Sequence, residues 1–360
     1  MISLWIGFIV FVLLVLALDL GVFHRKAHVV SVREALGWSA VWISLGLAFA
    51  AFVYFAYQGH WFGLGFAVDP VDGLANTGAR AVEKYLTGYI VEKSLSVDNI
   101  FVISMIFSFF AVPSLYQHRV LFWGILGALV MRGAMIAIGA RLIAEFHWVL
   151  YVFAAFLIIT AIKMLSFSSD HGDPGNNIVI RLTRRLFPVT EHFHGERFVV
   201  RAGTPASHEN AFPGAPVVRD AVVESARAGA LLLTPLALAL IMVETTDLIF
   251  AVDSIPAIFA ITGDPFLVFT SNVFAILGLR SLYFALAGMV DKFRYLKVSL
   301  ALILLVVGVK MLLAEWLKAA LGKNFNLYLL LVVMLILAAG VVSSMFADRR
   351  AAAPPRGPSS

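Results

Sequence analysis

The stretch that decides the fold is Val243-Glu244-Thr245-Thr246-Asp247-Leu248-Ile249-Phe250-Ala251-Val252-Asp253-Ser254-Ile255, an apolar run that holds three carboxylates. A second run, Val91-Glu92-Lys93-Ser94-Leu95-Ser96-Val97-Asp98-Asn99-Ile100-Phe101, holds two more. An ionised acid at the centre of a membrane helix costs on the order of 3 kcal/mol, so five would oppose insertion by about 15 kcal/mol if nothing neutralised them. We expect a counter-charge at both runs, with a bound cation as the leading candidate.

The composition identifies the medium in which these runs lie. Of 360 residues, 61% are hydrophobic and only 14% are charged, whereas an ordinary soluble domain is nearer a quarter charged. Apolar runs of about 20 residues are long enough to span a bilayer as helices. They predict an all-α, polytopic transmembrane bundle of about nine helices, near residues 2–24, 37–57, 88–112, 119–143, 147–167, 229–262, 266–289, 296–317 and 326–346.

The two acidic runs belong to an internal repeat. Val97-Asp98-Asn99-Ile100 aligns with Val252-Asp253-Ser254-Ile255, and this register sets Glu92 opposite Asp247. Each copy holds three predicted spans, an odd number, so the repeats should be inverted, with a substrate site where they meet. The predicted segments are N-terminal helices and an outside loop (1–78), the first repeat (79–167), a cytoplasmic loop (168–228), the second repeat (229–318), a last helix (319–347) and a disordered tail (348–360).

Charge and motif content narrow the function classes. A net charge of +5 is compatible with nucleic-acid binding. However, most Lys and Arg residues lie in the loops that would be cytoplasmic if the N-terminus is outside and the C-terminus is cytoplasmic, which is the usual distribution in membrane proteins. We therefore expect the lipid bilayer, and no nucleic acid, as a partner. The chain has no Cys, and it lacks nucleophile-elbow, phosphate-loop and zinc-protease motifs. No catalytic residues, organic cofactor or enzymatic activity are expected.

Helical spacing limits how the acids can cooperate. Glu92 and Asp98 are six residues apart, which on a straight helix separates them by about 120° and about 9 Å. Asp247 and Asp253 have the same spacing, whereas Glu244 and Asp247 share a face. Either the helices are interrupted near the acids, where Ser, Thr and Pro256 are frequent, or the two helices complete one site together.

The chemistry of the available ligands indicates a hard divalent ion. Carboxylates and other oxygens suit Mg²⁺, Ca²⁺ or Mn²⁺ better than Zn²⁺ or Cu⁺. The predicted metal ligands are Glu92, Asp98, Glu244, Asp247 and Asp253, and the supporting residues are Asn99, Thr245, Ser254, Asn272, Lys93, Arg280 and Asp19. The alternative is burial of the acids as ion pairs with Lys93, Arg132, Lys163, Arg280 and Lys310. A mixture of both, in which Lys93 and Arg280 neutralise acids or compete with the cation, is also open.

At these motifs the chain resembles the TerC family of integral membrane proteins, including its Alx branch. The resemblance rests on Glu92 to Asn99, Glu244 to Ala257 and the run from Asp264-Pro265-Phe266 to Arg280-Ser281-Leu282-Tyr283. It implies a fold of the lysine-exporter-like superfamily and a bacterial inner-membrane protein of metal homeostasis, chiefly exporting Mn²⁺, with Ca²⁺ as a second ion. The family's implicated acids map onto the five residues above. Export of another cationic substrate, or a non-transporting role in metal or tellurium resistance or in metallation of exported proteins, remains an alternative.

Overall fold

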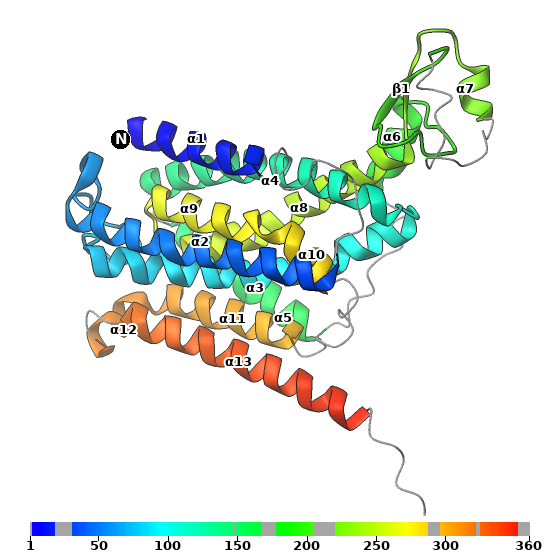
Figure 1. Ribbon diagram of the computed structural model, residues 1–360. Helices are drawn as coiled ribbons and strands as arrows, with labels where there is room; N and C mark the ends of the chain where they lie inside the picture. The colour runs from blue at the N-terminus through cyan, green and yellow to red at the C-terminus, as the bar shows by residue number, and fades with distance from the viewer. Residues whose placement is uncertain are drawn as a thin grey trace, which may run out of the picture.

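Long helices lie side by side through most of the molecule, and a small mixed unit projects beyond one end of them (Figure 1). The computed structural model describes residues 2–18, 31–146, 148–166, 178–204, 220–286, 296–321 and 325–351. The helices are α1 (Ile2–Leu18), α2 (Val32–Gln58), α3 (Gly78–Phe109), α4 (Ser114–Glu145), α5 (Val149–Ser166), α6 (Ile178–Leu186), α7 (Ala221–Ser225), α8 (Pro235–Phe259), α9 (Pro265–Leu277), α10 (Leu279–Leu286), α11 (Leu296–Leu312), α12 (Ala314–Leu321) and α13 (Phe325–Ala351). A short 3-10 helix, η2 (Trp61–Gly63), and two short strands, β1 (Val199–Arg201) and β2 (Leu231–Leu233), complete the regular structure of these ranges.

In the described part of the chain, six segments are long and apolar enough to cross a membrane: α2, α4, α5, α8, the pair α9 and α10, and Asn326–Ser344 of α13. Shorter apolar helices are formed by Ile2–Leu18 and Val298–Leu312. Each of the nine predicted stretches overlaps one helix over most of its length, except that 266–289 holds the pair α9 and α10, 296–317 holds α11 and the start of α12, and 229–262 includes β2 before α8. The all-α polytopic fold is confirmed, and the exact number of spans stays a prediction.

The pair α9 and α10 forms the central span. Its apolar window, Pro265–Leu286, is 89% buried, against 22% for the window of α13. The N-terminal helices cover it through tilted aromatic contacts, with the ring centroids of Phe49 of α2 and Phe8 of α1 at 4.6 and 6.0 Å from that of Phe274. The two N-terminal helices, which lie outside the predicted repeat, therefore pack against the centre of the bundle.

The helices of the two predicted repeats pack on one another in a reciprocal way. In the predicted repeat, α3, α4 and α5 correspond to α8, the pair α9 and α10, and α11. Helix α3 packs on α9 as α8 packs on α4, and α5 packs along its repeat counterpart α11. This pattern is the one expected if α3–α5 and α8–α11 are two related units that interlock. It supports the predicted repeat, whose inverted sense stays a prediction.

The predicted interruption of the acidic helices does not occur, because α3 and α8 are continuous through their acids. The hydroxyls of Ser96 and Thr245 donate to the carbonyls of Glu92 and Ile241, four residues earlier, at 2.8 and 2.7 Å. Such bonds satisfy a hydroxyl within its own helix and leave the backbone helical. The break lies in the seventh predicted span instead, between α9 and α10 at Gly278.

Part of the predicted loop 168–228 folds into a small unit. Strands β1 and β2 pair antiparallel, with Val200 opposite Leu232, and the side chains of Val200, Ala202, Val223 and Leu232 form its core. Asp220 caps α7 by accepting from the N–H groups of Val222 and Val223. At the other end of the chain, α13 continues to Ala351, so the helix extends past residue 347 into the segment predicted as a disordered tail.

Candidate functional site

A buried arginine joins the two acidic runs. Arg132 of α4 is 2% exposed and forms a two-pronged ion pair with Asp247 of α8, Nη2 to Oδ1 at 2.8 Å and Nε to Oδ2 at 3.1 Å. Its Nη1 donates to Oε1 of Glu92 on α3. A guanidinium can grip two carboxylates because its planar fork presents donors in several directions. The result is a Glu92–Arg132–Asp247 centre built from three helices.

Neutral groups complete this centre. Nη1 of Arg132 lies 3.3 Å from Oγ of Ser254 and 3.4 Å from Oδ1 of Asn272, which belongs to α9. Oε2 of Glu92 and Nδ2 of Asn272 are buried and have no hydrogen-bond partner among the described residues. Buried polar atoms without partners are rare and costly. The centre therefore holds unsatisfied oxygen and amide groups beside its one cation.

Glu244 adds a third carboxyl beside this centre. It lies one turn before Asp247 on α8, within electrostatic range of that residue, and its buried Oε2 has no hydrogen-bond partner. Gly127 of α4 makes room for it, since a Cβ at residue 127 would overlap the carboxylate of Glu244. The glycine of the repeated Ile125-Leu126-Gly127 segment thus leaves the space in which the carboxylate of Glu244 lies.

The remaining two acids form a separate pair further along α3 and α8. Asp253 lies within electrostatic range of Asp98 and of Lys163, and the hydroxyl of Thr160 on α5 hydrogen-bonds to it. Both carboxylates are half-buried. Four of the five acids therefore lie near their counterparts in the repeat: Arg132 bridges Glu92 and Asp247, and Asp98 lies within electrostatic range of Asp253.

The structure does not gather all five acids into one coordination sphere. Among the described residues, no group of three His, Asp or Glu side chains is placed to hold a metal ion. This agrees with the helical spacing, which separates the members of each run by about 9 Å. The role of these acids as metal ligands stays a prediction, and the ion-pair alternative is realised at Arg132.

The predicted counter-ions Lys93 and Arg280 contribute differently. Nζ of Lys93 donates to the carbonyl of Ala275 at 3.0 Å, near the end of α9, where a cation compensates free carbonyls and the helix dipole. A Cβ at Gly278 would lie 2.9 Å from that Nζ. Lys310 does the same for α8 by donating to the carbonyl of Ala260 at 2.8 Å. Arg280 is buried in the first turn of α10.

The other supporting residues fall in three places. Ser254 and Asn272 contact Arg132, as described above. Asn99 is buried, and the hydroxyl of Thr245 bonds within its own helix. Asp19 lies outside the described residues. Arg132 itself appeared in the sequence only as one of five bases within spans, and nothing in its neighbours distinguished it.

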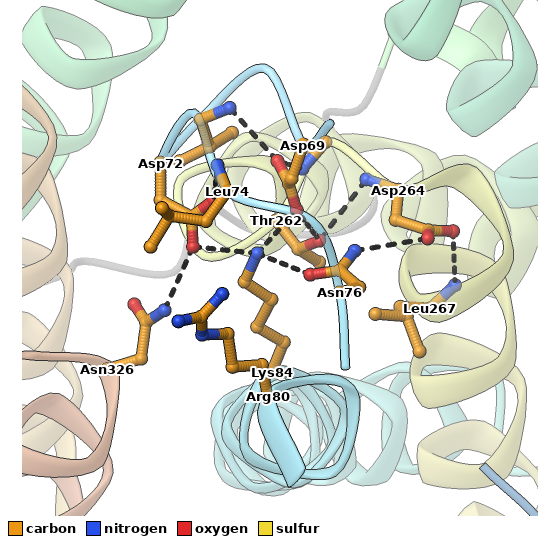
Figure 2. A network of polar contacts seen from close by, with 12 residues as sticks. Asp69, Asp72, Leu74, Asn76, Arg80, Lys84, Thr262, Asp264, Leu267 and Asn326 are labelled. Atoms are coloured by element: carbon orange, nitrogen blue, oxygen red, sulfur yellow. Dashed lines mark hydrogen bonds and ion pairs between the residues drawn. The ribbon is translucent and has the colours of Figure 1, made fainter. Parts of the chain in front are cut away.

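A second buried network, which sequence reasoning missed, lies at the end of the bundle where α3 and α9 begin. Figure 2 shows Lys84 of α3 pointing into a ring of polar side chains. Its Nζ lies 2.8 Å from a carboxylate oxygen of both Asp69 and Asp72 and 2.7 Å from Oδ1 of Asn76, and none of the three charged side chains is exposed. Asn326 of α13 donates to Asp72 at 3.3 Å.

The same network includes the loop between α8 and α9. The hydroxyl of Thr262 and the N–H of Gly263 donate to Asp69, while Asp264 accepts from Asn76 at 3.2 Å and caps α9. Burial alone would raise the pKa of Asp69, but the charge of Lys84 and the hydrogen bonds outweigh it and hold that pKa below its ordinary value. Burial raises the pKa of Asp264, and the charge of Asp69 adds to the rise. The network ties the two repeats together at this end.

The fold and these buried charges define an integral membrane protein with ion-paired carboxylates inside its helical bundle. The model of the integral membrane protein TerC family matches residues 77–352. An uncharacterised membrane protein of Myxococcus xanthus is 47% identical over 97% of this chain and 94% of its own length. A protein of Escherichia coli strain K12 named "Putative membrane-bound redox modulator Alx" is 42% identical over 92% of both chains. No solved structure matches. The chain belongs to the TerC family.

Proposed function

We propose that this protein exports a divalent metal ion across the bacterial inner membrane, Mn²⁺ in the first place and Ca²⁺ as the second candidate. The observation that carries the proposal is the Glu92–Arg132–Asp247 centre with its unsatisfied carboxylate oxygens. Intramembrane acids that several helices bring together mark ion and substrate routes in membrane proteins. The acids act here as ligands for a transported ion, and the proposal assigns no enzymatic step to them.

Charge balance favours a divalent ion at this centre. Arg132 supplies one positive charge to Glu92 and Asp247, and Glu244 lies beside them with a buried oxygen. Three ionised carboxylates then face one cation, so the centre lacks two positive charges. A divalent cation would neutralise Glu92 and Asp247 completely and satisfy their oxygens. Arg132 and the ion would then compete for the same carboxylates. Arg132 would pair with Glu92 and Asp247 when no ion is bound, and the bound ion would displace its guanidinium from them.

The Asp98–Asp253 pair provides a second station on the same route. The helices α3 and α8 run in opposite directions, since the loop before α3 hydrogen-bonds to the loop after α8. Asp98 therefore lies about 9 Å from Glu92 in one direction along the bundle, and Asp253 about 9 Å from Asp247 in the other. An ion between α3 and α8 would have both pairs of acids centred at a similar depth in the bilayer. Thr160 supports the second pair, so α5 also contributes to this route.

The Lys84 network supports a closed state of one end of the route. It joins Lys84 of the first repeat to the α8–α9 loop of the second through Asp69, which pairs with Lys84 and accepts from Thr262 and Gly263. Alternating access by movement of one repeat against the other would have to break these contacts. If the N-terminus is outside, as the distribution of Lys and Arg predicts, this network would lie on the outer side, so we assign it to the exit.

Reconstituted vesicles loaded with a manganese-sensitive dye test the proposal. The parent protein should give a dye response, and Glu92→Gln and Asp247→Asn should not. Glu145→Gln is the matched control, because Glu145 is an exposed acid that pairs only with Arg141 on its own helix. A response to a cationic amino acid gradient without any to Mn²⁺ would replace the proposal by export of another cation.

Folded protein that moves no substrate would overturn transport and favour a membrane partner in metal or tellurite resistance. The name of the E. coli relative describes it as a redox modulator. Redox chemistry in the present chain would not run through thiols, because it has no Cys. The same vesicles, which contain no other protein, separate direct ion movement from such an indirect role.

A further inference from the structure

The short helix α6 has a surface that the proposed transport function does not use. Its sequence is Ile178-Val179-Ile180-Arg181-Leu182-Thr183-Arg184-Arg185-Leu186, nine residues, far fewer than the roughly 20 needed to span a bilayer. Figure 1 places α6 beyond the end of the bundle from which α8 begins, beside the β1–β2 unit. It is therefore a helix at the boundary of the membrane bundle.

The apolar side chains of α6 divide into an anchor and an open strip. Ile180 is 3% exposed and packs in the cluster that includes Leu236 of α8. Ile178, Leu182 and Leu186 follow one another at four-residue intervals, which places them on one strip of the helix, and they are 76%, 55% and 64% exposed. With Ile180 packed against the bundle, the apolar strip of Ile178, Leu182 and Leu186 faces away from the protein.

Basic residues lie along one side of that strip. Arg181, Arg184 and Arg185 are all exposed, and α6 has no acidic residue. At 100° per residue, Arg185, Arg181 and Arg184 lie about 20°, 60° and 120° from Ile178 around the helix axis, all on the side away from Leu182. An apolar strip edged by cations is the pattern of helices that lie in a membrane interface, with the apolar face among the acyl chains and the cations at the headgroups.

We infer that α6 binds the membrane surface and recognises anionic phospholipid. The occupant follows from charge complementarity, since three arginines beside an exposed apolar strip match a phosphate-bearing, negatively charged lipid surface. Phe187, directly after the helix, is also exposed and extends the apolar contact. The helix then tethers the β1–β2 unit at the membrane, whatever substrate the bundle carries.

The absence of Cys allows a direct test on the full chain. A single Leu182→Cys variant, labelled with a nitroxide and placed in nanodiscs, reports the depth of this position from its relative accessibility to oxygen and to a water-soluble nickel chelate. In nanodiscs that contain phosphatidylglycerol, the chelate accessibility should be at least threefold lower than in nanodiscs of phosphatidylcholine alone. Ser225→Cys, at an exposed position of α7, should remain accessible to the chelate in both lipids.

Two further results decide the inference. Adding Arg184→Gln and Arg185→Gln to the labelled variant should remove the difference between the two lipids, because the cations that select phosphatidylglycerol are lost. A label at residue 182 that is open to the chelate in both nanodiscs would overturn the inference. So would a label shielded equally in both lipids and in detergent, because the strip would then be packed against the protein itself.

Discussion

Replacement of Arg132 by Gln should destabilise the protein strongly. The side chain is 2% exposed and holds Glu92 and Asp247, whose side chains are 1% and 12% exposed. Removing one partner of a buried ion pair leaves uncompensated charge and costs about 3–5 kcal/mol. With two carboxylates left facing each other, we expect a loss at the upper end of that range in the free energy of unfolding.

The assay is reversible unfolding in mixed micelles with increasing SDS, followed by circular dichroism of the helices. Arg141→Gln is the matched control, because Arg141 lies on the same helix, is exposed and pairs only with Glu145. Exposed pairs at this spacing contribute about 0.3–0.5 kcal/mol.

A triple variant, Arg132→Gln with Glu92→Gln and Asp247→Asn, removes all three charges together. It should recover most of the stability that the single variant loses, since neutral residues of similar volume often replace a buried ion pair without cost. A single variant as stable as the Arg141→Gln control would refute the reasoning. An unrescued triple variant would show that the loss came from packing and not from charge.

Three further outcomes follow from the same structure. Gly127→Ala should push the carboxylate of Glu244 away and reduce Mn²⁺ flux in vesicles, and adding Glu244→Ala should restore the stability of the variant without its flux. Lys84→Met should lower the free energy of unfolding by about 3–5 kcal/mol. Folding lowers the pKa of Asp69 from its ordinary 3.8, so the ion pair stabilises the protein fully above pH 3.8 and loses this effect as the pH falls through the folded pKa. The variant should lack this acid-dependent loss of stability. Asp253→Asn should abolish manganese export, so cells that express it and still lower their manganese content as the parent does would refute the second station.

The transmembrane helices and the choice of acids could be predicted from sequence because both depend on local properties. Apolar runs of bilayer length set the helices, and the repeat register paired Glu92 with Asp247 and Asp98 with Asp253 before their contacts were known. A carboxylate within an apolar run is also easily recognised in a sequence. The structure accordingly has α3 and α8 as helices with these acids along them.

Arg132 and Lys84 could not be identified in the same way. The sequence of α4 gives no sign of which neighbours Arg132 faces, since that depends on the rotation and packing of α3, α8 and α9. The Lys84 network draws on three separate segments, and its members read singly as loop residues. The helix break was expected near the hydroxyl-rich acids, but those hydroxyls bond to their own helix, and the chain breaks at Gly278 instead.

The central claim is that Arg132 and a divalent cation compete for the carboxylates of Glu92 and Asp247. Equilibrium Mn²⁺ binding to the purified protein, followed by the loss of the electron paramagnetic resonance signal of free Mn²⁺, tests it most directly. The account predicts that Glu92→Gln and Asp247→Asn weaken binding at least tenfold and that Arg132→Gln strengthens it. Equal affinity in the parent and all three variants would contradict the claim.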